Sequence, residues 1–185
     1  MRLRPFIAAG VAAALAVAPA ACAPARASLG VEARAETAAG EVRPSAGAAV
    51  YLLDEDLIRL AMAEPGAGDP VGRAVHQRHP RLRVLAGLMN GRRLSAYPLG
   101  PDVRLLVEQS RPLWEPRVVR AARADEQGRA AFADLAPGDY WLVCLDERGG
   151  RVAFWNLRLT LARGANAITL DGRNALTVGN AGWAR

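Results

Sequence analysis

The sequence predicts a mainly β protein, an antiparallel β-sandwich, and local features of three kinds support this prediction. Asp125–Gly128 has the residues of a tight turn, with Asp at its first position and Gly at its fourth. Pro137-Gly138 fits the centre of a type II turn, because proline presets the first central position and glycine accepts a positive φ at the second. Val152–Leu161 alternates along its length, which is typical of a strand with one buried face. Short strands separated by turn signals favour two packed sheets.

The first residues have the composition of an export signal. A basic start precedes the short apolar stretch Phe6–Val17 and a Pro/Ala-rich region. Two processing routes fit: a signal peptide of residues 1–27 with a small-x-small cleavage site, or one of residues 1–21 followed by lipidation of Cys22, as in bacterial lipoproteins. We expect export to the periplasm, the outer envelope or the medium, with a lipid anchor as the only membrane contact.

The segment after the signal peptide is predicted to contain a linker and the start of the sandwich. Residues 28–39 are rich in Ala, Glu and Arg and show no apolar period, so a linker is predicted there. The sandwich is predicted to start near Gly40, to span residues 40–171 and to include a strand at Ala48–Leu53. An alternative places its start near Arg81, after a separate N-terminal extension.

A partly helical insertion is predicted at about residues 54–100. Asp54–Asp56 can cap a helix over Leu57–Glu64, because aspartate favours helix starts. Val71–His79 is predicted to form another helical turn. Arg81–Met89 alternates and leads into an Asn-Gly hairpin signal, so a strand is predicted there.

The rest of the chain is predicted to consist of strands and loops. Strands are expected at Val103–Gln109, Val118–Ala124, Arg129–Ala133, Tyr140–Leu145, Val152–Leu161 and around Ile168–Leu170. Ser110–Pro116 is expected to be a loop, with Trp114 at the edge of the core, and residues 172–185 a tail. Tyr140–Leu145 is apolar on both faces, so the insertion is expected to cover one of them.

The stretch between the two turns resembles the hallmark of carboxypeptidase regulatory-like domains, which share the prealbumin (transthyretin-like) β-sandwich fold. The pattern is an Asp-x-x-Gly turn, an aromatic strand residue, a leucine and Pro-Gly-x-Tyr. The matching residues are Asp125, Gly128, Phe132, Leu135, Pro137, Gly138 and Tyr140. The resemblance covers roughly residues 103–171 and implies the fold, with Phe132 and Leu135 in the core. It implies no particular activity, because one fold hosts many functions.

Charge and residue types narrow the functions to consider. The net charge is +6 and the chain contains no lysine, which excludes Schiff-base and lysine-isopeptide chemistry. The arginines are scattered among acidic residues without interleaved aromatic residues, so a nucleic-acid partner is not expected. Cys144 lies inside an apolar strand and is expected to be a buried hydrophobe.

We expect a non-catalytic protein with a structural or adhesive role, whose partners are envelope or secreted proteins or a glycan. An alternative is a binding module for a glycan, a peptide or a small molecule, with Trp114 as its aromatic platform. The least favoured alternative is a metal-dependent enzyme using His76 and His79, which are spaced i,i+3. A stable metal site needs further ligands that this spacing does not supply, so no catalytic residue, metal or cofactor is expected.

Overall fold

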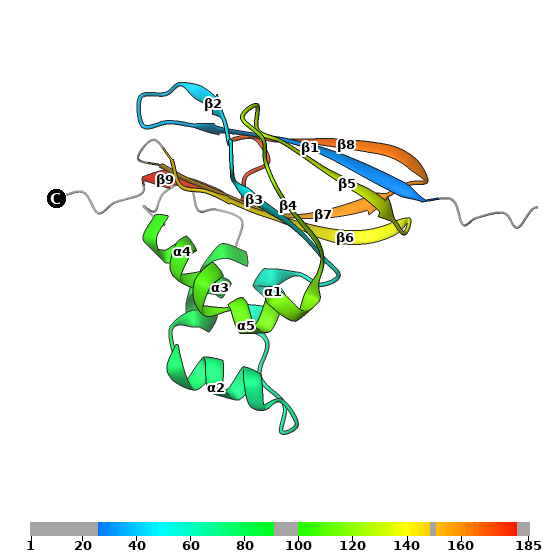
Figure 1. The fold of residues 1–185 in the computed structure, drawn as a ribbon. Helices are drawn as coiled ribbons and strands as arrows, with labels where there is room; N and C mark the ends of the chain where they lie inside the picture. The colour runs from blue at the N-terminus through cyan, green and yellow to red at the C-terminus, as the bar shows by residue number, and fades with distance from the viewer. Residues whose placement is uncertain (1–25, 91–99, 149–150, 181–185) are drawn as a thin grey trace, which may run out of the picture.

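The computed structural model describes residues 26–90, 100–148 and 151–180, which form two packed β-sheets and a helical layer (Figure 1). Sheet 1 consists of β1 (Ala27–Glu36), β2 (Val42–Pro44), β5 (Arg129–Leu135) and β8 (Gly164–Leu170). Sheet 2 consists, in spatial order, of β4 (Val118–Arg123), β3 (Ala49–Leu53), β6 (Gly138–Asp146), β7 (Arg151–Leu161) and β9 (Thr177–Asn180). The prediction of a mainly β, antiparallel sandwich with a partly helical insertion is confirmed. The parallel pairing of β1 with β8 is an exception to the antiparallel pattern.

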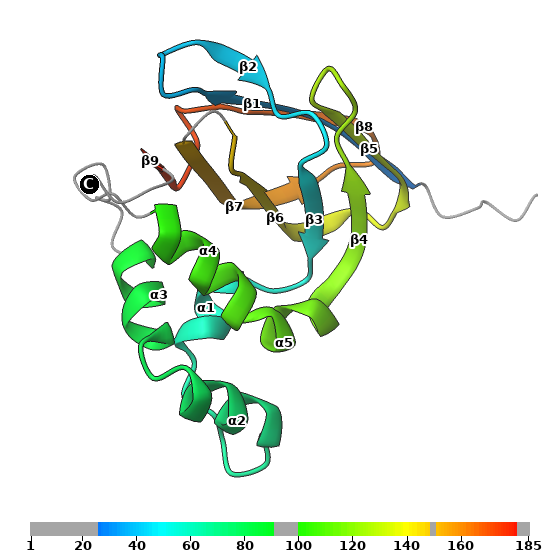
Figure 2. The same ribbon diagram turned by 60° about the vertical axis from the view of Figure 1, so that its left-hand side comes forward.

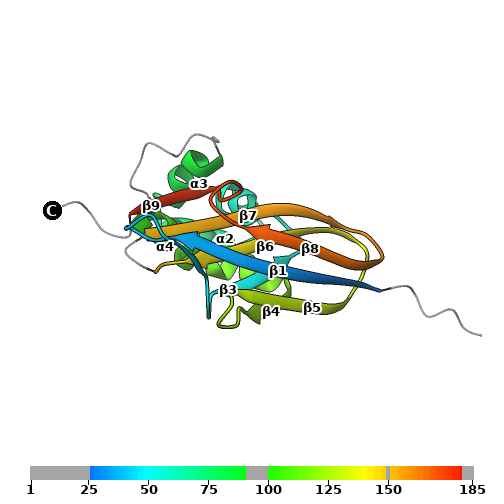
Figure 3. The same cartoon turned by 90° about the horizontal axis from the view of Figure 1, so that it is seen from above.

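Strand β1 is the centre of sheet 1. It pairs antiparallel with β5 along its first half and with β2 near its end, and β8 lies along its other side (Figure 3). Its buried residues alternate with outward-facing ones. The buried set is Ala27, Leu29, Val31 and Ala33, and the outward set is Ser28, Gly30, Glu32 and Arg34.

The linker predicted at residues 28–39 is therefore wrong, because most of this segment is β1. The sandwich starts at Ala27, and neither Gly40 nor Arg81 is its first residue. Two of the four buried positions of β1 are alanines, which gave the segment a weak apolar period. The segment that follows forms the short strand β2.

The two turns highlighted by the sequence carry the chain between the sheets. Asp125–Gly128 connects β4 in sheet 2 to β5 in sheet 1, and Pro137 lies where the chain returns from β5 to β6. The strands on either side of each turn hydrogen-bond to other strands, not to each other. Within the first turn, Asp125 Oδ1 accepts hydrogen bonds from the amides of Gln127 and Arg129, at 2.9 and 2.8 Å.

Gly128 docks this turn against β1. It has a φ of 76°, and a Cβ there would lie 2.3 Å from the carbonyl oxygen of Ala33. The amide of Ala33 donates a hydrogen bond to the Gly128 carbonyl at 2.8 Å. A side chain at position 128 would therefore separate the turn from the central strand of sheet 1.

The core between the sheets contains the residues expected there. Phe132 and Leu135 of sheet 1 pack against Tyr140, Leu142 and Cys144 of sheet 2. The hydroxyl of Tyr140 donates to the carbonyl of Ala136 at 2.8 Å, which satisfies its polar end. Burial raises the pKa of the Cys144 thiol to about 12, so it is an apolar side chain and not a nucleophile at neutral pH.

The helices form a layer on the outer face of sheet 2, in which the helix of residues 70–78 lies farthest from the sheet (Figure 2). They are α1 (Leu57–Met62), α2 (Pro70–Arg78), α3 (Leu82–Asn90), α4 (Gly100–Gln109) and α5 (Arg111–Trp114), followed by the 3₁₀ helix η1 (Glu115–Arg117). Val143 and Phe154 of sheet 2 belong to the core that these helices complete. The expectation that the insertion covers the β6 strand is confirmed. Within the described ranges, no helix has the length and apolar character needed to cross a membrane.

The strands predicted at Arg81–Met89 and Val103–Gln109 are wrong, because both segments are helical. In α3 the buried residues are Leu82, Ala86 and Met89, a helical spacing. The segment also shows the alternation expected of a strand, but Val84, one of the alternating apolar residues, is 63% exposed. The loop predicted at Ser110–Pro116 is also wrong, since it forms α5 and most of η1.

Two boundaries also change. The insertion extends beyond residue 100 to η1, so that the chain returns to the sandwich only at Val118. The tail predicted at residues 172–185 is wrong in part, because it contains β9, which pairs with residues Arg151–Phe154 of β7. Residues 91–99, which include the glycine of the Asn-Gly hairpin signal, lie outside the described residues.

Asp56 joins the helical layer to sheet 2. As expected for a helix start, its Oδ1 accepts a hydrogen bond from the amide of Ile58, at 2.9 Å. The same oxygen accepts a hydrogen bond from Nδ2 of Asn156 on β7, at 2.7 Å. Asn156 is largely buried, so this contact fixes α1 against the sheet.

Replacing Asp56 with alanine should lower the free energy of unfolding by about 1–3 kcal/mol, because it removes a helix cap and leaves Asn156 unpaired. Urea denaturation of wild type and D56A measures the difference. Asp54→Ala is the matched control, since the Asp54 side chain is exposed and should change stability little. In a double mutant with Asn156→Ala the two losses should not add. Additive losses would show that the contact contributes nothing.

Candidate functional site

Trp114 does not form the exposed platform that the binding hypothesis required. It is 3% exposed, and its indole Nε1 donates to the carbonyl of Val107 at 2.9 Å. Its ring meets that of Tyr51 edge-on, with centroids 5.2 Å apart. Trp114 therefore packs the helical layer onto β3, and the expectation of a ligand platform there is corrected.

The two histidines face different depressions of the helical layer. His76 lines the space between α2 and α5, together with Asp69 and Leu113. His79, the residue after α2, lines a neighbouring depression beside Gln109. Among residues 26–90, 100–148 and 151–180, no three His, Cys, Asp or Glu side chains gather in a way that could hold a metal ion.

Burial lowers the pKa of His76, and the nearby positive charge of Arg83 lowers it further. Asp69 and the carbonyl of Ala63 oppose this shift with smaller effects. The buried Nδ1 atom of His76 has no hydrogen-bond partner among the described residues. The surroundings of His76 therefore favour its neutral form.

The carboxylates of the turns and strands serve ion pairs and hydrogen bonds. Glu147 accepts a bidentate interaction from Arg104, with distances of 2.6–2.9 Å. Hydrogen bonds from Thr160 and Arg158 lower the pKa of Asp139, which keeps it ionised. These contacts join neighbouring elements, so the carboxylates of Glu147 and Asp139 have structural roles.

The outer face of sheet 1 is the candidate site, because no layer of described residues covers it (Figure 1). Gly30 of β1 lies in register between Ala131 of β5 and Ala167 of β8. These small residues leave a depression of about 470 Å³ across three strands. It is lined by Gly30, Val31, Glu32, Asp125, Arg129, Ala130, Ala131, Ala167, Ile168 and Thr169.

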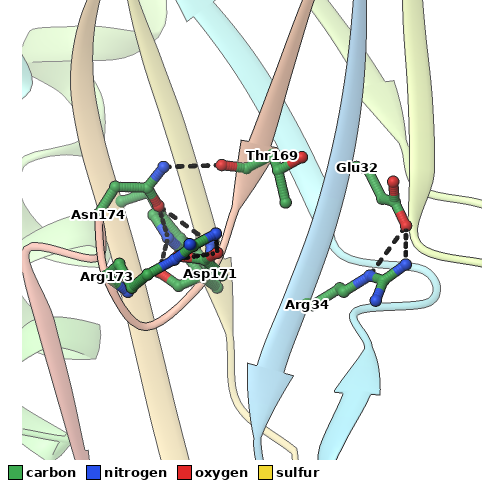
Figure 4. A network of polar contacts seen from close by, with 7 residues as sticks. Glu32, Arg34, Thr169, Asp171, Arg173 and Asn174 are labelled. Carbon is green, nitrogen blue, oxygen red and sulfur yellow. Dashed lines mark hydrogen bonds and ion pairs between the residues drawn. The ribbon is translucent and has the colours of Figure 1, made fainter.

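A second depression of about 680 Å³ continues along the same face and shares Glu32 and Thr169 with the first. Its lining is charged (Figure 4). Glu32 accepts two hydrogen bonds from Arg34, at 2.9 and 2.5 Å, and Asp171 accepts two from Arg173, at 2.9 and 2.6 Å. We call the two depressions together the outer groove. One half has a floor of small residues, and the other carries paired charges.

Sequence reasoning missed the outer groove because it treated β1 as a linker. The alternation of Ala27, Leu29, Val31 and Ala33 was the available signal, and it places Gly30 and Glu32 on one face. The structural motif residues lie at the turns and in the core, and Asp125 of the first turn also lines the groove. Cys22, the predicted lipidation residue, lies outside the described residues.

Comparison with known proteins finds no matching family model and no matching curated protein. A solved structure of a candidate carbohydrate-binding protein from Pseudomonas aeruginosa, PA1324, is 14% identical, with a TM-score of 0.38, covering 80% of this chain and 88% of that one. The minor pilin GBS52 of Streptococcus agalactiae is 9% identical, with a TM-score of 0.41, covering 85% of this chain and 46% of the pilin. The pilus backbone protein RrgB of Streptococcus pneumoniae is 15% identical, with a TM-score of 0.31, covering 74% and 35%. This chain thus spans less than half the length of either pilin, and similarities of this size say nothing about function.

His76 should titrate below its ordinary pKa of 6.5 in the folded protein, which NMR of its ring protons can measure. Because its pKa is lower in the folded protein, protonated His76 is less favourable there than in the unfolded chain. Neutral His76 therefore contributes fully to the free energy of unfolding above pH 6.5. This contribution is lost as the pH falls through the folded pKa. His79→Gln identifies the His76 resonance, and His76→Gln should reduce the loss of stability in acid. A His76 pKa at or above 6.5 would contradict the described packing of α2.

Proposed function

We propose that this chain is an exported, non-catalytic protein with a structural or adhesive role in the cell envelope or outside the cell. The uncovered outer groove on sheet 1 is the observation that carries the proposal. Exposed sheet faces of small residues suit contact with another molecule, since they let it approach the backbone closely. The partner would be an envelope or secreted protein or a glycan.

We also propose that the sandwich is a carboxypeptidase regulatory-like domain of the prealbumin type. The motif residues have roles that support this assignment. Asp125 and Gly128 form the turn that docks on β1, and Phe132, Leu135 and Tyr140 lie in the core. The motif thus has a physical role in joining the two sheets.

The start of β1 bears on the processing of the export signal. Ala27 is buried and pairs with both Leu135 and Gly164, and the carbonyl of Arg26 accepts a hydrogen bond from the Gly164 amide at 3.0 Å. Cleavage after Ala27 would remove these contacts, whereas cleavage before Cys22 would keep them. We therefore favour a lipid-anchored form that starts at Cys22.

A binding module for a glycan, peptide or small molecule is the second candidate, and the same groove favours it. The side chains of Glu32, Arg34, Asp171 and Arg173 offer hydrogen-bond donors and acceptors beside the apolar floor. A soluble glycan or peptide that bound the purified protein in this groove would favour this function over a structural role.

Filling the groove should abolish an adhesive role while the fold is retained. Gly30→Trp places a large side chain on the groove floor, and the nearest atom to its Cβ, the Asn166 carbonyl oxygen, is 3.9 Å away. Cells lacking the protein should regain surface attachment with wild type but not with G30W. The attachment of complemented cells measures this effect.

Gly68→Trp is the matched control, because Gly68 lies in an exposed loop and has no atom near its Cβ position. G68W should restore attachment fully. Circular dichroism should show that both variants fold. Full attachment with folded G30W would overturn the proposed role of the groove.

Mass spectrometry of the native protein should find a mature chain that starts at Cys22 and carries lipid. Cys22→Ser should move the protein from the membrane fraction to the soluble exported fraction. Wild-type protein that starts at Ser28 would overturn the anchor and leave the role of the groove unchanged.

A further inference from the structure

Strand β8 is an uncharged edge of sheet 1. Among the described residues it pairs only with β1. Its sequence, GANAITL, has no charged residue and no proline. Edge strands usually carry such residues, because they discourage pairing with other chains. Of the other edge strands described, β2, β4 and β5 do so, with Arg43 and Pro44 in β2, Arg120 and Arg123 in β4 and Arg129 in β5, and only the four-residue β9 does not.

The register of β8 shows which backbone groups face outward. The amide of Gly164 donates to Arg26, towards β1, at 3.0 Å. Because successive residues of a strand direct their amide and carbonyl to opposite sides, those of Ala165, Ala167 and Thr169 point away from β1. The Thr169 carbonyl confirms this direction, since it accepts a hydrogen bond from the Asn174 side chain at 2.7 Å.

Asn174 closes one end of this edge. Its Nδ2 donates to the carbonyl of Thr169, and its Oδ1 accepts from the amide of Asp171 at 3.0 Å. The side-chain amide thus takes the place of a neighbouring strand beside these two residues. Within the described ranges, the outward backbone groups of Ala165 and Ala167 make no hydrogen bond, which leaves them for a partner.

We propose that a second copy of this chain adds its own β8 to this edge, antiparallel, with the two-fold axis beside Asn166. Ala165 of each copy then pairs with Ala167 of the other, and the two pairs exchange about four hydrogen bonds. Asn174 sets this register, because a longer overlap would push the incoming strand against its side chain. The interface is self-complementary, as a two-fold axis requires.

The charges at the ends of β8 favour a second copy over an unrelated strand. Arg163 precedes β8 and is exposed, and Asp171 follows it. Antiparallel pairing places each Arg163 diagonally across from the Asp171 of the other copy, at about 7–8 Å between backbones, which an arginine side chain can span. Parallel pairing would bring the two Arg163 side chains together. The alanines at the contact let the strands meet without obstruction.

The paired copies would form one continuous sheet, with the two outer grooves on the same face. This inference rests on β8 and does not depend on the proposed adhesive role. The contact is small, so it belongs to the weak class of interfaces, with dissociation on the order of micromolar concentration.

Sedimentation velocity of the full mature chain, over about 1–500 µM, tests the proposal. The wild type should shift from monomer to dimer across this range. Ala167→Pro removes an outward amide without removing a bond to β1, so it should remain monomeric. Ala165→Lys should also remain monomeric, because it charges the edge. Arg163→Glu should weaken the dimer at least several-fold.

Ala133→Lys is the control, because it places the same charge at an exposed position of β5, on the far side of β1 from β8 and outside the groove lining. It should dimerise like the wild type. Circular dichroism and thermal unfolding establish that each variant is folded. A wild type that stays monomeric throughout, or a folded A167P variant that dimerises like it, would overturn the proposal.

Discussion

The structure depends on the apolar character of sheet 2 on both of its faces. In β6, Tyr140, Leu142 and Cys144 point to one side, and Trp141 and Val143 point to the other. A sheet of this kind is stable in water only when both faces are covered, because each large apolar side chain contributes roughly 1.5–3 kcal/mol on burial. Sheet 1 covers one face, and the helices between β3 and β4 cover the other. The insertion is therefore part of the folded core and not an appendage.

Buried polar groups position these layers. Asn156 on sheet 2 donates to Asp56, which also caps α1. On the opposite face of β7, the indole Nε1 of Trp155 donates hydrogen bonds to the backbone carbonyl of Asp171 and to Oδ1 of Asn174, at 3.0 and 3.1 Å. Both contacts satisfy groups that would be costly to bury alone. The Asn174 side chain also bonds to the backbone at the end of β8, so it connects Trp155 in the core to the edge of sheet 1.

Sheet 1 needs only one covered face, and this leaves its outer face available. Its outward residues near Gly30 are small, whereas its inward residues fill the core. The outer groove and the free edge of β8 share Ala167, whose side chain lies on the groove floor and whose backbone lies at the edge. Both features lie on the side of the sandwich that the helical layer does not cover.

Local chemistry made much of the fold predictable. Asp125, Gly128 and Pro137 are constrained by their own turns, and β6 and β7 show their buried faces in their alternation. The sheet to which each strand belongs could not be predicted, because the same turn residues serve a hairpin and a crossing between sheets. The strand β1 was missed because alanine gives a weak apolar signal, and with it the candidate site.

By itself, then, the sequence determined the class of the fold, the strands between Val118 and Leu170 and the turns between them, since these follow from neighbouring residues. Tertiary structure decided that Arg81–Met89 is helical, because its apolar residues fit both a helical and an alternating period, and packing against α1 and α4 selects the helical set that is buried. It also decided the outer groove, because Gly30, Ala131 and Ala167 come from three distant segments that meet only when β1 pairs with β5 and β8.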